Sequence, residues 1–201
     1  MKKFLYTNSR LLVIVFLFFT ACEGIFVPDP IDPRIPKYTE DGNNVAGAFI
    51  DGNIWESVVK TGFLLNPPLD TPLITASQEK DSLIVCFYGN TDGKNSSIEF
   101  HLTGIPISKF EDLTSLDGQK IQLDGIKNTG YYIEDYTPST YANKGIGQIY
   151  FRNVRKERLS SKIILSGTFG FSMNDSNGKT IKVTSGRFDY GIYESVNFRM
   201  E

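Results

Sequence analysis

The chain has 201 residues, a formal net charge of −2, and a composition that is 40% hydrophobic and 22% charged. This length is typical of one domain that buries a full hydrophobic core. Its slight acidic excess is the opposite of the basic face that nucleic-acid-binding proteins present, so we expect no nucleic-acid partner.

An export segment opens the chain. Basic residues precede an apolar run over residues 11–20, LLVIVFLFFT, which is shorter than the ~20 residues of a membrane span and typical of a secretory signal peptide. The residues that end it, FTAC at 19–22, resemble a bacterial lipobox. The resemblance implies cleavage after residue 21, acylation of Cys22, and placement as an outer-membrane lipoprotein of the cell envelope, on its periplasmic or its surface face. A plain secretory signal and an uncleaved anchor are the alternatives.

Residues 22–44 are expected to form a tether, because four prolines between residues 28 and 36 favour extended polyproline geometry. About 20 such residues, at ~3.1 Å each, would reach ~60 Å from a membrane. Without residues 1–21 the chain has a net charge of about −5, since those residues hold three basic side chains and no acidic one. Residues 45–201 are predicted to form a single domain.

A hairpin is predicted at the start of this domain. Asp51-Gly52 is a strong two-residue turn signal between apolar runs. Trp55, just after the turn, is expected to anchor the core, with an exposed binding ring as the alternative. The proline-broken residues 63–73 are expected to form a loop or an edge segment.

A second hairpin is predicted to follow. The strand over residues 83–88 is apolar on both faces, so we expect it to be central and to bury Cys86 as an inert thiol. It pairs with residues 96–105, where His101, the only histidine, falls on the polar face. The sequence pattern places no second histidine and no free thiol on that face to share a metal ion with His101. We therefore predict no metal site and no cofactor.

Residues 130–151 are unusually rich in tyrosine. Such rigid rings with a polar hydroxyl are typical of surfaces that bind a sugar, a peptide or another flat ligand. The alternative is that the rings lie in strands and loops that close the core. One regular strand cannot bury every ring of this turn-rich segment on one face, so the candidate ligand-binding residues are Tyr131, Tyr132, Tyr136 and Tyr141.

Residues 152–162 gather five basic side chains around Glu157. A solvated turn between two strands is one interpretation, and a contact with an acidic partner or a lipid headgroup is the other. Whichever applies, the segment is expected to join two strands.

The C-terminal part is predicted to form a long hairpin. Residues 162–173 and 179–190 alternate between apolar and polar side chains around the Asn177-Gly178 turn signal. The alternation slips by one residue at Ser185-Gly186, which a β-bulge would correct. Together these patterns predict an all-β fold, either an antiparallel sandwich or a lipocalin-like barrel of about 8–10 strands, with at most one short helix. That helix is expected within residues 107–118.

Several of these segments carry a family resemblance. SGTFGF at 166–171 followed by KVTSGRFD at 182–189 is similar to the C-terminal signature of a domain-of-unknown-function family of Bacteroidetes envelope lipoproteins. DGNIW at 51–55 resembles the opening hairpin of that family, and the strand over residues 145–151 also fits. The resemblance covers most of residues 45–190. It implies a compact all-β fold on a lipid anchor and supplies no catalytic residue.

Two functional hypotheses follow. The sequence holds no GxSxG, HExxH, P-loop or Cys/His pairing, so we expect a protein that is not an enzyme. The first hypothesis is a tethered module that binds a glycan or a protein partner at the cell envelope. The alternative is a lipocalin-like carrier of a small apolar ligand. A filled core with an exposed aromatic patch would favour the binding module, whereas an apolar cavity would favour the carrier.

Overall fold

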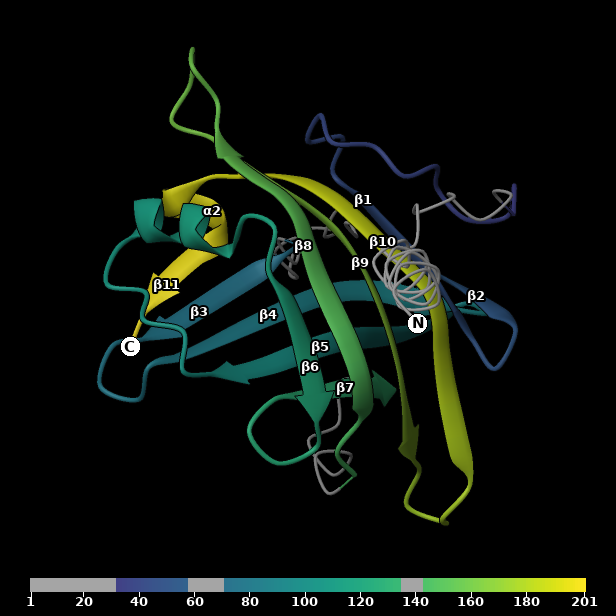
Figure 1. Cartoon of the computed structure of the whole chain (residues 1–201). Coiled ribbons are helices and arrows are strands. Elements are labelled where there is room, and N and C mark those ends of the chain that lie inside the picture. The colour runs from purple at the N-terminus through teal and green to yellow at the C-terminus, as the bar shows by residue number, and fades with distance from the viewer. Residues whose placement is uncertain (1–31, 58–70, 135–142) are drawn as a thin grey trace, which may run out of the picture. The chain divides into compact units, whose positions relative to one another are not determined.

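The predicted all-β architecture is confirmed. The computed structural model describes residues 32–57, 71–134 and 143–201, and strands dominate them (Figure 1). The strands are β1 (Val45–Ile50), β2 (Asn53–Glu56), β3 (Leu73–Ser77), β4 (Ser82–Thr91), β5 (Lys94–Thr103), β6 (Lys120–Asp124), β7 (Thr129–Glu134), β8 (Ile146–Lys156), β9 (Ile163–Asn174), β10 (Thr180–Ile192) and β11 (Phe198–Met200). A short 3-10 helix, η1 (Phe110–Leu116), lies where the helix was predicted, and a four-residue helix, α2 (Glu194–Asn197), precedes β11. The described residues thus hold one more short helix and one more strand than the sequence predicted.

The strands form one mixed sheet that curls into a half-barrel, so the barrel-like alternative replaces the sandwich (Figure 1). Its path runs β11-β3-β4-β2-β1-β10-β9-β8-β6, with β5 along β4 and β7 along β5. Since β5 pairs with the whole of β4, strands β3 and β2 share the other edge of β4, at opposite ends. A bridge between Gly130 and Gly145 connects β7 to the residue before β8. The half-barrel is therefore most nearly closed at that point.

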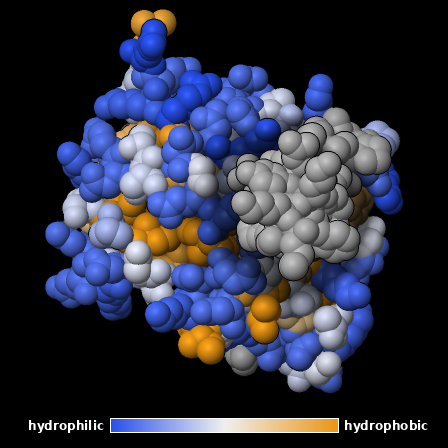
Figure 2. All heavy atoms as spheres, viewed as in Figure 1, coloured by the Kyte–Doolittle hydropathy of each residue, from blue (hydrophilic) through white to orange (hydrophobic). Residues whose placement is uncertain are grey.

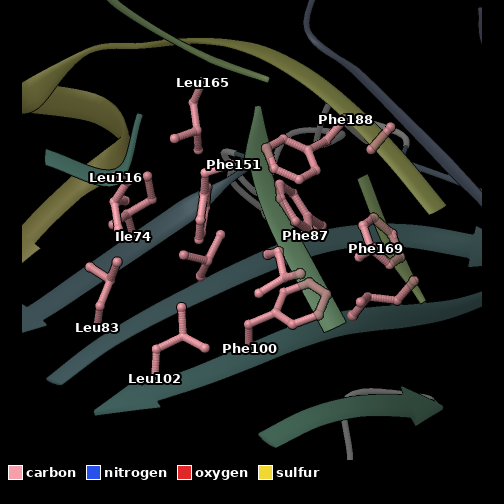
Figure 3. Close-up of a cluster of buried hydrophobic side chains, with 14 of the residues drawn as sticks. Ile74, Leu83, Phe87, Phe100, Leu102, Leu116, Phe151, Leu165, Phe169 and Phe188 are labelled. Atoms are coloured by element: carbon pink, nitrogen blue, oxygen red, sulfur yellow. The ribbon is translucent and has the colours of Figure 1, made fainter. Parts of the chain in front are cut away.

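Aromatic rings fill the concave interior of the sheet (Figure 3). The ring of Phe87 on β4 lies 6.2 Å from that of Phe100 on β5 and 6.2 Å from that of Phe169 on β9, measured between centroids. Phe188 on β10 lies 5.1 Å from Phe87. Trp55 is fully buried beside this cluster, as predicted for a core anchor. The apolar faces of strands far apart in the chain thus form one packed core.

The turns agree with their sequence signals. Asp51 (φ 51°) and Gly52 (φ 87°) both adopt the left-handed conformation that a two-residue hairpin of this type needs. The register of β9 against β10 shifts at Ser185 (φ 54°), which confirms the predicted bulge. Gly178 (φ 80°) lies in the predicted turn, but the loop is longer than two residues and spans 175–179.

The compact unit begins at Pro33, eleven residues before the end of the predicted tether at Asn44. Ile35 is buried in the domain. The chain then passes the carboxylate of Asp189 on β10, which is itself buried. We call this contact the Asp189 clasp: the carboxylate accepts hydrogen bonds from the hydroxyls of Thr39 and Ser166 and from the backbone N–H groups of Asp41, Gly42 and Asn43.

The basic side chains of β8 hold the same segment from its other side. The Nε atom of Arg152 lies 3.3 Å from Oε1 of Glu40, and Arg155 donates a hydrogen bond to the backbone carbonyl of Glu40 at 3.1 Å. Arg152 also lies over the ring of Tyr38, 5.3 Å from its centroid. Two of the five basic side chains of residues 152–162 therefore contact Glu40 of the same chain, and Arg152 does so as an ion pair.

Candidate functional site

A pocket of about 300 Å³ opens at the end of the half-barrel where hairpin turns meet the end of β7. We call it the mouth pocket. Such barrel mouths are common places for ligand sites, because loops converge there on a rigid scaffold. The pocket is lined by Ile50, Asp51, Asn53, Thr91, Asp92, Lys94, Tyr132, Glu134, Asp175, Lys179 and Ile181.

A buried hydroxyl network underlies the mouth pocket. The Tyr132 hydroxyl donates a hydrogen bond to Oγ1 of Thr91 at 3.0 Å, and Oγ1 of Thr91 lies 3.2 Å from Oγ of Ser96. Burial raises the pKa of Tyr132, although its hydrogen bond to Thr91 acts in the opposite direction. The phenol therefore stays protonated at neutral pH, and its orientation is fixed by the network.

Part of the charged rim is committed to holding the turns in place. Asp51 accepts a hydrogen bond from the backbone N–H of Lys182 at 2.8 Å and forms an ion pair with Lys179 at 3.2 Å. The backbone hydrogen bond, followed by the contact with Lys179, lowers the pKa of Asp51. Asp175 accepts hydrogen bonds from two backbone N–H groups of its own loop. These three side chains fix the shape of the rim.

Other rim side chains are open to a ligand. Asp92 and Lys94 project from the β4–β5 turn, are exposed, and make no side-chain hydrogen bond or ion pair within the described residues. The lining as a whole has four carboxylates against two amines. Such a surface suits a ligand that offers hydroxyl, amide or amino groups, and it is poorly suited to an apolar molecule.

The structure describes two of the four tyrosines predicted to bind a ligand, and both are buried. Tyr131 and Tyr132 are 6% and 3% exposed, so neither offers a ring face for stacking. Tyr131 packs its ring against that of His101, with 4.8 Å between centroids, whereas Tyr132 points inward below the mouth pocket. Tyr136 and Tyr141 lie outside the described residues. The remaining candidates for stacking are therefore Tyr136 and Tyr141.

A second polar cluster lies on the outer face of β4 and β5. The largely buried carboxylate of Glu99 is close to Nε2 of His101 (3.2 Å), Oγ of Ser97 (3.4 Å) and Sγ of Cys86 (3.7 Å). Burial, followed by the charge of Glu99, raises the pKa of the Cys86 thiol far above its usual range. A protonated, buried thiol is a poor nucleophile, which supports its interpretation as an inert thiol.

The sequence indicates turns that line the mouth pocket, but it does not predict the pocket itself. Asp51 and Asp92 each precede a glycine in a hairpin turn, and the first of these turns was predicted from the sequence. Their convergence with Lys179 depends on pairings between distant strands. A sequence pattern alone therefore locates the turns but not their meeting point.

The chain matches no protein-family model, no curated protein and no solved structure. The resemblance to Bacteroidetes envelope lipoproteins therefore stays a prediction from the sequence. Cys22 lies outside the described residues. Within the residues that the structure describes, none of the helices is long and apolar enough to cross a membrane.

Proposed function

We propose that the chain is a lipid-anchored protein of the cell envelope whose domain binds a polar ligand, a glycan or a segment of a protein partner, without catalysing a reaction. The observation that carries this proposal is the mouth pocket. It combines a rigid rim, an oriented phenol and two available charged side chains in about 300 Å³, a volume at the lower end of known ligand sites.

The packed interior supports a polar ligand over an apolar one. A lipocalin-like carrier needs a cavity inside its barrel. The described interior is instead occupied by the stacked rings of Phe87, Phe169 and Phe188, together with Tyr190. The carrier alternative thus gains no support from the core, whereas the polar lining of the mouth pocket favours recognition by hydrogen bonds.

The anchor rests on the sequence. The basic start, the apolar run over residues 11–20 and the cysteine at its end support export and acylation at Cys22. A binding domain held at a membrane needs little affinity per site, because the anchor confines it near its partners. This fits a pocket that is small and largely polar.

A glycan array and a pull-down from envelope extracts would test the proposal. The double variant Asp92→Asn with Lys94→Gln removes both available charges from the rim. Glu79→Gln with Lys80→Gln is the matched control, because one acidic and one basic side chain are exposed there on the β3–β4 turn, at the other end of β4. We expect the rim variant to lose binding to whatever ligand the parent captures, while the control retains it and both keep the parental unfolding midpoint.

Equal capture of ligand by the parent and the rim variant would mean that the ligand does not bind at the mouth pocket. The double variant Tyr136→Ala with Tyr141→Ala then tests the remaining tyrosine candidates in the same assays. Loss of binding in that variant alone would move the site to the tyrosine segment.

A further inference from the structure

The β8–β9 hairpin projects from the half-barrel and ends in an apolar residue. Figure 1 shows the connection between β8 and β9 standing out beyond the rest of the sheet, and Figure 2 shows an apolar tip on a hydrophilic projection at that place. The apolar residue in this turn is Leu159, which is 99% exposed. A leucine this exposed at the end of a projection makes no contribution to the packed core, so its side chain is free to contact a partner.

The turn that carries this leucine is basic. The hairpin tip, which we define as residues 155–162, has four basic residues and one acidic residue, in a chain whose overall charge is negative. Arg155 and Lys156 are exposed at the end of β8, where Arg155 donates to the Glu40 carbonyl and Lys156 lies 3.4 Å from Oε1 of Glu111. Arg158 is exposed next to Leu159. Arg158 makes no side-chain hydrogen bond or ion pair within the described residues.

The single acidic residue of the hairpin tip is used inside the turn. Glu157 accepts a hydrogen bond from the Ser160 hydroxyl at 2.6 Å and lies 3.4 Å from the ammonium group of Lys162. The backbone N–H of Glu157 also donates to the carbonyl of Lys162 at 2.9 Å. The turn is thus closed by its own polar groups, and its negative charge is paired internally. Arg158 and Leu159 are left facing outward.

We propose that the hairpin tip is a membrane contact that places Leu159 among the headgroups of an anionic bilayer, with Arg158 at the phosphates. Lys and Arg are attracted to anionic lipid surfaces, and their aliphatic stems allow the charge to stay at the headgroup level. An apolar side chain beside such a residue lowers the free energy when it enters the boundary between the headgroups and the acyl chains. This contact is independent of acylation at Cys22.

The shape of the tip favours a bilayer over an acidic protein. A stable protein interface buries about 800 Å² on each partner. A narrow, convex turn with one apolar side chain cannot supply that area. A bilayer surrounds a convex tip from every side, and it combines an anionic surface with an apolar layer beneath.

Fluorescence from a reporter at the tip would test this contact in the full chain. Cys22→Ser prevents acylation, and Leu159→Cys then provides an exposed thiol for an environment-sensitive nitrobenzoxadiazole label, since Cys86 is buried. The matched control carries the label at Asn177→Cys, an exposed position on the β9–β10 loop. Both proteins share the same N-terminal segment, so binding through that segment affects them equally. The probes are vesicles of equimolar phosphatidylglycerol and phosphatidylcholine, and vesicles of phosphatidylcholine alone.

We expect a blue shift for the label at position 159 on the anionic vesicles only, and no shift for the label at position 177. Arg158→Gln should weaken binding to the anionic vesicles about fivefold, whereas Lys80→Gln on the β3–β4 turn should leave it unchanged. No shift at 159, equal shifts at 159 and 177, or equal shifts on both vesicle types would overturn the proposal. Binding of the tip to soluble polyglutamate without a shift on vesicles would also overturn it and would indicate an acidic protein partner.

Discussion

Asp189 accepts a hydrogen bond from the backbone N–H of Gly42 at 2.7 Å, which ties the last long strand to the segment that leads into the first one. Gly42 has a φ of 75°, and a Cβ atom there would lie 3.2 Å from the backbone nitrogen of Gly191. The left-handed glycine therefore lets the chain turn tightly enough to present three consecutive N–H groups to one carboxylate.

Asp189→Asn should destabilise the domain by about 3 kcal/mol. The substitution removes a charge that accepts five hydrogen bonds, and it turns an amide NH2 group toward hydroxyl and N–H groups that also donate. Urea unfolding followed by Trp55 fluorescence measures this. Asp41→Asn is the matched control, since the Asp41 side chain is exposed, and it should change stability by less than about 0.5 kcal/mol. Equal stability of the two variants would mean that the clasp does not hold the domain together.

The stability of the clasp should depend on pH. Burial raises the pKa of Asp189, but hydrogen bonds from Thr39, Ser166, Gly42 and Asn43 outweigh it and leave the pKa below its ordinary value. A lowered folded-state pKa stabilises the fold above the unfolded-state pKa of about 4, and this contribution is lost as the pH falls through the folded-state value. Urea midpoints of the parent and of Asp189→Asn should therefore converge below about pH 4. A constant difference between them down to pH 2 would contradict this.

Gly89→Ala should destabilise the domain by about 1–3 kcal/mol. A Cβ atom at Gly89 would lie 2.6 Å from the indole ring of Trp55 and 2.5 Å from the backbone carbonyl of Glu56, so the packed core would have to shift. Gly170→Ala is the control, because the nearest atom to a Cβ there is the Val183 carbonyl at 3.4 Å. Thermal unfolding should separate the two variants, and a tolerated Gly89→Ala would show that Trp55 can move.

Phe169→Ala should cost about 3–5 kcal/mol, since its buried ring lies 5.2 Å from that of Phe100 and stacks near that of Phe87. Leu159→Ala removes a large apolar side chain of the exposed turn and should leave the unfolding midpoint unchanged. Chemical denaturation compares the two. A loss below about 1 kcal/mol for Phe169→Ala would mean that the core can collapse around the missing ring.

Acylation at Cys22 is a prediction from the sequence. In cells supplied with labelled fatty acid, the parent should incorporate the label, and Cys22→Ser should not. Cys86→Ser is the control, because the buried Cys86 thiol is not part of the export motif. Equal labelling of the parent and Cys22→Ser would contradict lipid attachment at this residue.

The sequence predicted the features that depend on neighbouring residues. The bulge at Ser185 follows from a break in the alternation of side chains, and the Asp51-Gly52 turn follows from two residues that tolerate a left-handed backbone. The mouth pocket and the clasp could not be predicted in this way. Asp189 and Gly42 are 147 residues apart in the sequence, and such a contact depends on how β1 pairs with β10. The opposite directions of Tyr131 and Tyr132 follow from strand alternation, but burial of the outward one required the tertiary structure.

The clasp also shortens the tether that would connect an acylated Cys22 to the domain. With Pro33 already part of the compact unit, residues 22–32 would connect an acylated Cys22 to the domain, and eleven residues reach about 34 Å at the ~3.1 Å per residue used for the full tether. This is a little over half of the ~60 Å expected for the full tether. Because the volume that a tethered domain can reach grows as the cube of the tether length, the effective concentration of the domain at the bilayer would be about fivefold higher. Opening the Asp189 clasp would lengthen the tether and lower the effective concentration of the mouth pocket near partners at the membrane.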